Sequence, residues 1–287
     1  MSASPVFLLS FYCVAIAVFS LMGGWITQRI RMTHNRTQLM MSFVSGLMLG
    51  VAFYHLLPHS MALFGGDHAA DETVWWLMIG LVVMLLLLRL FHFHQHDFSH
   101  GEPQSHNHHD YSHHNHHSGS IHSLSWVGIG LGLGVHTLID GIALGAVLQG
   151  ESGADSMGGL LGVGVFLAIL LHKPLDAMSI ITVMEAGGWS LKARWLVNIG
   201  FALMCPLGAL LFYFGVDMAG DDRNLGVAIA LAFSAGAFIC IALSDLLPEV
   251  QFHSHDRGKL TLAFIVGIAL AYAMGSLEPA GAHLAHH

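Results

Sequence analysis

The sequence predicts an all-α membrane protein with eight transmembrane helices in a 3+2+3 inverted-repeat arrangement. Hydrophobic residues make up 54% of its 287 residues and charged residues only 10%, which is too little charge to cover a soluble globule of this size. Apolar stretches long enough to span a bilayer recur along the chain. Related motifs recur in mirrored order about its middle, which is typical of two halves that enter the membrane from opposite sides.

The predicted spans are joined by short connections, with one exception. They lie near residues 6–28, 40–64, 73–91, 124–148, 157–185, 191–215, 224–250 and 259–277. The first span is longer than the apolar core of a signal peptide and has no basic leader, so we expect it to be retained. We divide the chain into residues 1–91 with three helices, a loop at 92–123, residues 124–185 with two helices, and residues 186–287 with three helices and a short tail.

The basic residues predict the orientation in the membrane. Under alternating topology, all lysines and arginines except Lys173 and Arg223 fall on one side: Arg29, Arg31, Arg36, Arg89, Lys192, Arg194, Arg257 and Lys259. The loops on the opposite side are acidic. By the positive-inside rule the basic loops lie in the cytoplasm and both termini lie outside, in a plasma membrane or, in a bacterium, the inner membrane.

The long loop at 92–123 is rich in histidine and nearly free of apolar residues, so we expect it to be disordered without a ligand. Unprotonated imidazoles at mixed spacings form a loose, multi-site binder for divalent ions. The alternative is a solvated polar linker. The histidines that we expect to bind metal are His106, His108, His109, His113, His114, His116 and His117.

Two His-x-x-x-Asp pairs stand inside apolar spans, His136 with Asp140 and His172 with Asp176. An ionisable side chain at the bilayer centre costs roughly 3 kcal/mol, so their presence points to a function. Residues i and i+4 share one face of a helix. Two such helices facing each other would present four ligands to one ion. This ligand set suits Zn²⁺ and also admits Fe²⁺, Mn²⁺, Co²⁺ or Cd²⁺.

A second motif occurs in mirrored positions. Residues 55–59 read His-Leu-Leu-Pro-His in the second span, and residues 245–249 read Asp-Leu-Leu-Pro-Glu in the seventh. Because proline has no N–H, the backbone carbonyl one turn earlier loses its helical hydrogen bond. A membrane span tolerates such a carbonyl where the carbonyl lines a cavity. We expect four residues to line the inner exit or to relay metal, with a structural network between the two helices as the alternative: His55, His59, Asp245 and Glu249.

Taken together, these motifs resemble the ZIP (zinc- and iron-regulated-transporter-like) family of divalent-metal transporters over the whole membrane portion. The resemblance implies transport of a divalent ion, Zn²⁺ above all, into the cytoplasm rather than an enzymatic activity. It also implies a transport site on the fourth and fifth helices, with His136, Asp140, His172 and Asp176 as ligands. Thr137 stands where many members carry Asn, and both aspartates stand where many carry Glu.

Lys173 departs from the family pattern. Many members have an acidic residue directly after the first ligand of the fifth helix, where it helps to hold a second metal. A protonated ammonium cannot ligate and repels a nearby cation. We therefore predict a mononuclear site in which Lys173 is a tethered counter-charge to Asp140, Asp176 or Asp245. The alternative, a lysine that snorkels to the interface, fits poorly with a position deep in a long span.

Two other functions fit parts of the pattern. A cation-diffusion exporter also combines paired His-x-x-x-Asp helices with a His-rich loop, but that family has six spans and a soluble C-terminal domain. An intramembrane metalloenzyme would need a general base beside an open coordination position, and no His-Glu-x-x-His occurs. We expect the lipid bilayer and divalent metal ions as partners, with no resident cofactor and no nucleic acid. A homodimer is left open.

Overall fold

The chain forms a bundle of long helices in a computed structural model that describes residues 4–27, 34–92, 125–151, 162–218, 220–246 and 257–275. Within these residues, eight helices are long and apolar enough to cross a membrane, and none of the elements is a strand. The predicted all-α fold with eight spans is therefore confirmed. The predicted metal-binding histidines of the long loop lie outside the described residues, as does Glu249.

The spans follow one another along the chain, and two of them are composite. Their elements are α1 (Pro5–Thr27); α2 (His34–Val51) with η1 (Ala52–Leu56) and α3 (Leu57–Phe64); α4 (Ala69–His92); α5 (Ser125–Glu151); α6 (Val163–Ala186); α7 (Leu191–Asp217); η3 (Gly220–Asp222), a short 3₁₀ turn before α8 (Arg223–Ile241) and η4 (Ala242–Leu246); and α10 (Arg257–Met274).

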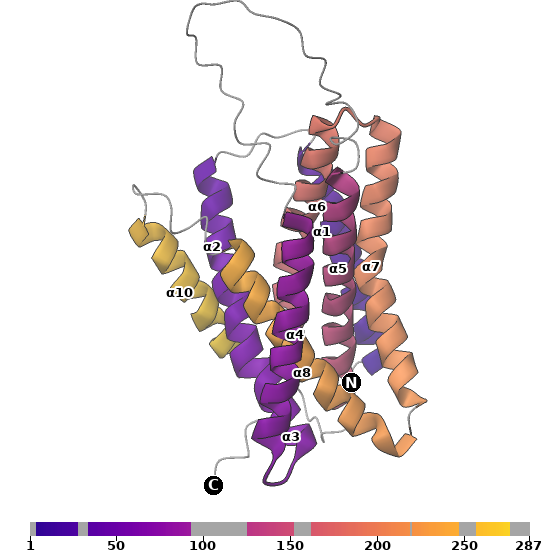
Figure 1. Cartoon of the computed structure of the whole chain (residues 1–287), viewed down its shortest axis with the longest axis vertical. Helices are drawn as coiled ribbons and strands as arrows, with labels where there is room; N and C mark the ends of the chain where they lie inside the picture. The colour runs from indigo at the N-terminus through magenta and orange to yellow at the C-terminus, as the bar shows by residue number, and fades with distance from the viewer. Residues whose placement is uncertain are drawn as a thin grey trace, which may run out of the picture.

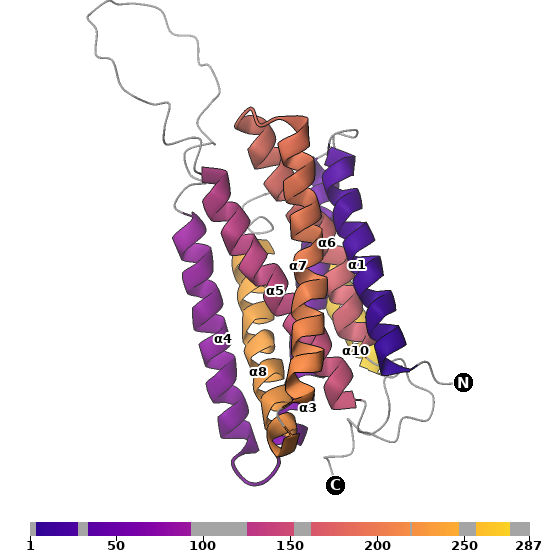
Figure 2. The same ribbon diagram turned by 90° about the vertical axis from the view of Figure 1, so that its right-hand side faces the viewer.

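Successive spans run in alternate directions, as Figures 1 and 2 show. The starts of α2, α5, α7 and α10 lie at one end of the bundle, and the connection from α3 to α4 lies at the other. The first end, here the basic end, carries Arg36, Arg89, Lys192, Arg194, Arg257 and Lys259. The other, here the acidic end, carries Asp67, Asp71, Glu72, Asp217 and Asp222, with Arg223. The predicted separation of charge is thus present along the bundle axis among the described residues.

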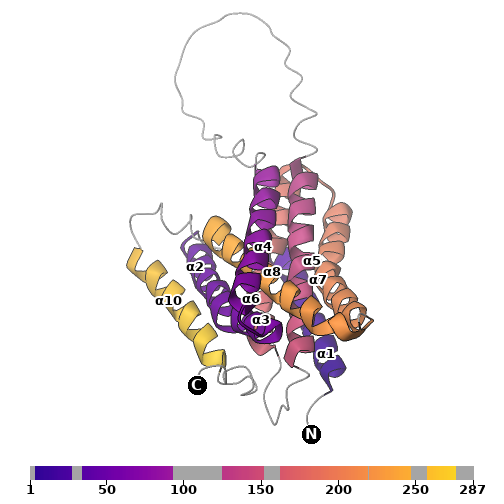
Figure 3. The ribbon, with the colours of Figure 1, turned by 60° about the horizontal axis from the view of Figure 1, so that its bottom comes forward.

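Four helix pairs pack most extensively: α1 with α6, α5 with α7, α2 with α10, and α4 with α8. Figure 2 shows α4 beside α8 and α1 beside α6, and Figure 3 shows the α2–α10 and α5–α7 pairs on opposite sides of the bundle. The predicted repeat matches the first three spans to the last three and the fourth to the fifth. This matching relates α1 to α7, α2 and α3 to α8, α4 to α10, and α5 to α6. It therefore maps the α1–α6 pair onto the α5–α7 pair, and the α2–α10 pair onto the α4–α8 pair. This packing supports the 3+2+3 arrangement.

Glycines allow the helices to approach closely beside both His-x-x-x-Asp pairs. A Cβ atom at Gly23 of α1 would overlap the backbone of Pro174 on α6, and one at Gly208 of α7 would overlap the backbone of Leu138 on α5. Leu138 and Pro174 are the middle residues of the two pairs. α1 and α7 therefore press directly against the two turns that carry the candidate ligands.

The second and seventh spans each contain a π-helical segment, η1 and η4, that ends on the first leucine of the Leu-Leu-Pro run. In η1, the N–H of Leu57 bonds to the carbonyl oxygen of Ala52, five residues back. Pro58 has no N–H to donate to an α-helical bond, so the wider turn falls where the regular ladder is already interrupted. The two motifs thus share a backbone distortion as well as a sequence.

Candidate metal site

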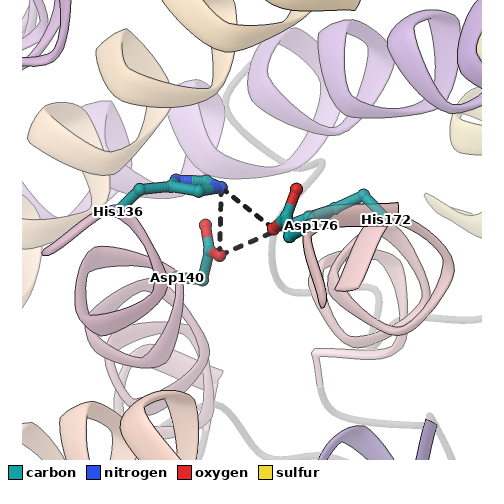
Figure 4. Close-up of side chains that lie close together, drawn as sticks. All are labelled: His136, Asp140, His172 and Asp176. Atoms are coloured by element: carbon teal, nitrogen blue, oxygen red, sulfur yellow. Dashed lines mark hydrogen bonds and ion pairs between the residues drawn. The ribbon is translucent and has the colours of Figure 1, made fainter. Parts of the chain in front are cut away.

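The four residues of the two His-x-x-x-Asp pairs converge at the centre of the bundle. His136 and Asp140 come from α5, and His172 and Asp176 come from α6 (Figure 4). One ligand atom from each lies within 4.8 Å of the others. Because each pair has helical i, i+4 spacing, each helix turns both of its side chains toward the same point. The convergence that the spacing predicts is therefore present.

Asp140 lies at the middle of this cluster. Its Oδ2 atom is 3.2 Å from Nε2 of His172 and 3.5 Å from Nε2 of His136. The second carboxylate is slightly farther from the rings, since Oδ2 of Asp176 lies 3.6 Å from Nε2 of His136 and 3.8 Å from Nε2 of His172. Asp140 is fully buried, whereas the side chain of Asp176 is 18% exposed. The cluster is thus closed around Asp140 and more open at Asp176.

A backbone contact fixes the orientation of His172. Its Nδ1 lies 2.8 Å from the carbonyl oxygen of Ala168, one turn back on α6. A carbonyl only accepts, so Nδ1 carries the proton and donates. In the neutral ring this leaves a lone pair on Nε2, which faces Asp140. Metal-ligating histidines are commonly oriented by such a second hydrogen bond.

His136 and Asp140 retain unused hydrogen-bonding capacity. Within the described part of the chain, three buried atoms have no hydrogen-bond partner: both ring nitrogens of His136 and Oδ1 of Asp140. Buried polar atoms almost always have a partner, and losing one costs about 1–3 kcal/mol. A cluster that tolerates such atoms is suited to a ligand that completes it.

Lys173 adjoins the cluster and is almost fully buried. Its Nζ donates to Thr137 Oγ1 at 3.0 Å and to Asp176 Oδ2 at 3.1 Å, and it also forms an ion pair with Asp140 Oδ2. The ring of Phe201 on α7 lies 5.6 Å from Nζ, within range of a cation–π interaction. These contacts are those of a counter-charge inside the bundle, and they do not fit a lysine that snorkels to an interface.

The mirrored motif in the second and seventh spans is split between the two ends of the bundle. His55 in η1 and His59 in α3 lie toward the acidic end, whereas η4, with Asp245, follows α8 toward the basic end (Figure 1). The ring of buried His55 contacts the carbonyl oxygen of Ala271 on α10 through Nε2 at 2.7 Å. The side chains of Asp245 and Glu249 lie outside the described residues. A role for the motif remains a prediction, and its two halves lie toward different ends of the bundle.

Sequence reasoning singled out neither Phe201 nor Phe238 beside the cluster. The ring of Phe238 on α8 meets the ring of His172 edge-on, with 6.5 Å between the centroids. Both phenylalanines stand on helices far along the chain from the pairs that they adjoin. Spacing within one helix carries no signal for such neighbours, so only the tertiary packing reveals them.

The fold and the cluster define a class of protein: a bundle of membrane-spanning helices with a buried His/Asp site of metal-ligand chemistry at its centre. The family profile described as ZIP zinc transporter matches residues 90–275, more than half of the chain. The chain belongs to the ZIP family.

Individual relatives agree with this assignment. The chain is similar to zinc transporter ZIP9 of Micropogonias undulatus, with 30% identity over 162 residues that cover 53% of this chain and 50% of the relative. Zinc transporter ZIP9-B of Xenopus laevis is 32% identical over 43% of this chain and 40% of its own length. Protein zntC of Dictyostelium discoideum is 32% identical over 46% of this chain and 31% of its own length. The chain thus spans half or less of the length of these relatives.

Proposed function

We propose that the chain carries divalent transition metal ions, with Zn²⁺ as the main substrate, through the His/Asp cluster between α5 and α6. The observation that carries this proposal is the buried convergence of four ligand atoms within 4.8 Å in a chain of membrane-spanning helices. The names of the relatives, which are zinc transporters in several animals, agree with it. Fe²⁺, Mn²⁺, Co²⁺ and Cd²⁺ are the competing substrates that the same ligand chemistry admits.

The donor set accounts for reversible binding of such an ion. Two imidazole nitrogens and two carboxylate oxygens match the ligands of Zn²⁺, which prefers four donors in a tetrahedron. His136, Asp140, His172 and Asp176 are the proposed ligands. A site of thiolates would hold the ion more tightly, but none of the four clustered residues in the described fold is a cysteine. A carrier must release its ion, so nitrogen and oxygen donors suit the task.

We propose that one ion binds at a time. The ammonium of Lys173 contacts one oxygen of each carboxylate, Oδ2 of Asp140 and Oδ2 of Asp176, so a second ion beside them would lie close to its charge. At about 4 Å and an effective dielectric of about 20, two unit charges repel by about 4 kcal/mol, and the term is larger for a divalent ion. That repulsion favours a mononuclear site.

The charge along the bundle supports a direction. The basic end is the expected cytoplasmic end, and the acidic end would then attract cations from outside. Entry at the acidic end and release at the basic end move the ion into the cytoplasm. The histidine-rich loop, which joins the third and fourth spans, would lie on the release side and receive or sense the ion there.

Uptake into proteoliposomes tests this function. We expect wild-type protein to carry Zn²⁺ and Asp140→Asn to reduce uptake by more than about tenfold, because the amide keeps the shape but loses the negative charge that the ion needs. Glu185→Gln is the control, since it removes the charge of an exposed carboxylate at the end of α6, away from the acidic end. Equal loss in both variants would place the defect outside the cluster. Net export from oriented vesicles would instead contradict the proposed direction.

A further inference from the structure

Lys173 holds the carboxylate oxygens that the proposed ligand set needs. Its Nζ contacts Oδ2 of Asp140 and Oδ2 of Asp176, and these two atoms are also the ones that face the histidine rings. An ion placed between the four ligands would therefore meet the ammonium at the same oxygens. The lysine and the ion cannot both keep their full contacts with this pair.

We propose that Lys173 is a resident counter-cation that the transported ion displaces from Asp140 and Asp176, so that this exchange sets how tightly the ion is held. This inference rests on the proposed transport function and specifies what tunes affinity at the same site. It goes beyond exclusion of a second ion, because here the lysine competes with the first.

The charges of the site indicate how the exchange would favour release of the ion. With neutral imidazoles, the two carboxylates and the ammonium sum to one negative charge, and bound Zn²⁺ turns that into one positive charge. Without the lysine, the empty site would hold two unpaired buried carboxylates, which is costly, and the loaded site would be neutral. The lysine thus stabilises the empty site and weakens the loaded one. Both effects promote release.

The structure also provides a place for the displaced ammonium. Oγ1 of Thr137 on α5 lies 3.0 Å from Nζ, and the centroid of the Phe201 ring on α7 lies 5.6 Å from Nζ. A hydroxyl and an aromatic face both stabilise an ammonium without a carboxylate. The flexible four-carbon stem of lysine lets Nζ shift toward these groups without movement of the backbone.

Transport kinetics of the full-length chain in proteoliposomes test the exchange, with Zn²⁺ as the probe. We expect Lys173→Gln to lower KM by about tenfold and to lower the maximal rate several-fold, because the ion no longer competes with the ammonium and leaves more slowly. Phe201→Leu keeps the lysine but removes its aromatic contact, so KM should rise about threefold. Lys192→Gln, which makes the same change at an exposed position of α7, should leave both constants unchanged.

The outcomes separate this inference from the function on which it rests. Absence of uptake by the wild-type chain would overturn the transport function itself. Uptake by Lys173→Gln with an unchanged or higher KM would overturn the exchange while the transport function stands, since loss of a merely structural contact does not tighten binding. Should Lys173→Gln fail to assemble in the membrane, Phe201→Leu decides: a raised KM supports the exchange and an unchanged KM overturns it.

Discussion

α5 and α6 carry the same His-x-x-x-Asp pair but differ at the two positions that follow the histidine. α5 continues with Thr137 and an ordinary leucine, whereas α6 continues with Lys173 and Pro174. Thr137 and Lys173 occupy equivalent positions in the two pairs and bond to each other. The repeat therefore supplies the candidate ligands twice but the cation once, and the proposed single-ion site rests on this asymmetry.

The largest effect is expected when one candidate ligand is removed from α5 or from α6. We expect His136→Ala on α5 and His172→Ala on α6 each to lower initial Zn²⁺ uptake by well over about a hundredfold, because each deletes one donor from a minimal set. Uptake rates, corrected for the amount of protein in the membrane, give the measurement. Retained uptake in one variant would show that the two helices do not share the site.

Exchanging Thr137 and Lys173 tests whether the positions after the two histidines are equivalent. Thr137→Lys puts a second ammonium beside the first, and repulsion should suppress Zn²⁺ uptake by more than about a hundredfold. Adding Lys173→Thr moves the single cation to the equivalent position on α5, so uptake should recover to within about tenfold of the wild-type rate. If the double variant is as inactive as the single one, the two positions are not equivalent around the ion.

The count of bound ions sharpens the comparison further. Lys173→Asp removes the repulsion and adds an oxygen ligand, so we expect two ions between α5 and α6 in this variant and one in the wild-type protein. Anomalous diffraction from crystals soaked in Cd²⁺ locates these ions separately from any held by the loop histidines. Two ions in the wild-type site would refute the mononuclear arrangement.

The smallest effects concern the glycines behind the two pairs. Gly23→Ala and Gly208→Ala each force a methyl group against a neighbouring backbone, and we expect each to lower the free energy of unfolding by about 1–3 kcal/mol. Gly200→Ala is the control, because a Cβ there meets open space. Thermal unfolding in detergent compares the three. A large difference between the first two would argue against equivalent packing of α1 on α6 and α7 on α5.

The sequence predicted the spans and the convergence of the four candidate ligand side chains because both depend on local periodicity. Helix α2 begins at His34, before the apolar stretch predicted from residue 40. The sequence misled here because a polar residue of the segment before residue 40, Gln38, is buried rather than exposed in a loop. Interior hydrogen bonds can satisfy such side chains, as the bond from Ser42 to the carbonyl oxygen of Leu260 on α10 does farther along the helix. Hydropathy alone cannot register such partners.

Contacts between distant helices were also beyond the sequence. Arg223 reads as the single cation among acidic loops, whereas in the structure it bonds to the backbone and side-chain oxygens of Gln149 on α5. Gln149 in turn donates to Asp217 at the end of α7. No spacing within one segment encodes this cross-link of three helices. The π-helical form of η1 was likewise not predicted, because a proline marks an interruption without specifying the hydrogen bonds around it.

η1 changes which neighbours the second span can face. An α-helix advances about 100° per residue, so one extra residue in a π turn rotates every later side chain by about that angle relative to an unbroken helix. Before η1, Ser42 bonds to α10 and Ser45 to the carbonyl oxygen of Ala242 in η4. After η1, Ser60 bonds to the carbonyl oxygen of Ala228 in α8. The extra residue of the π turn therefore sets the direction in which all later side chains of this span point. Deleting that residue would rotate His59 and Ser60 together away from their present neighbours.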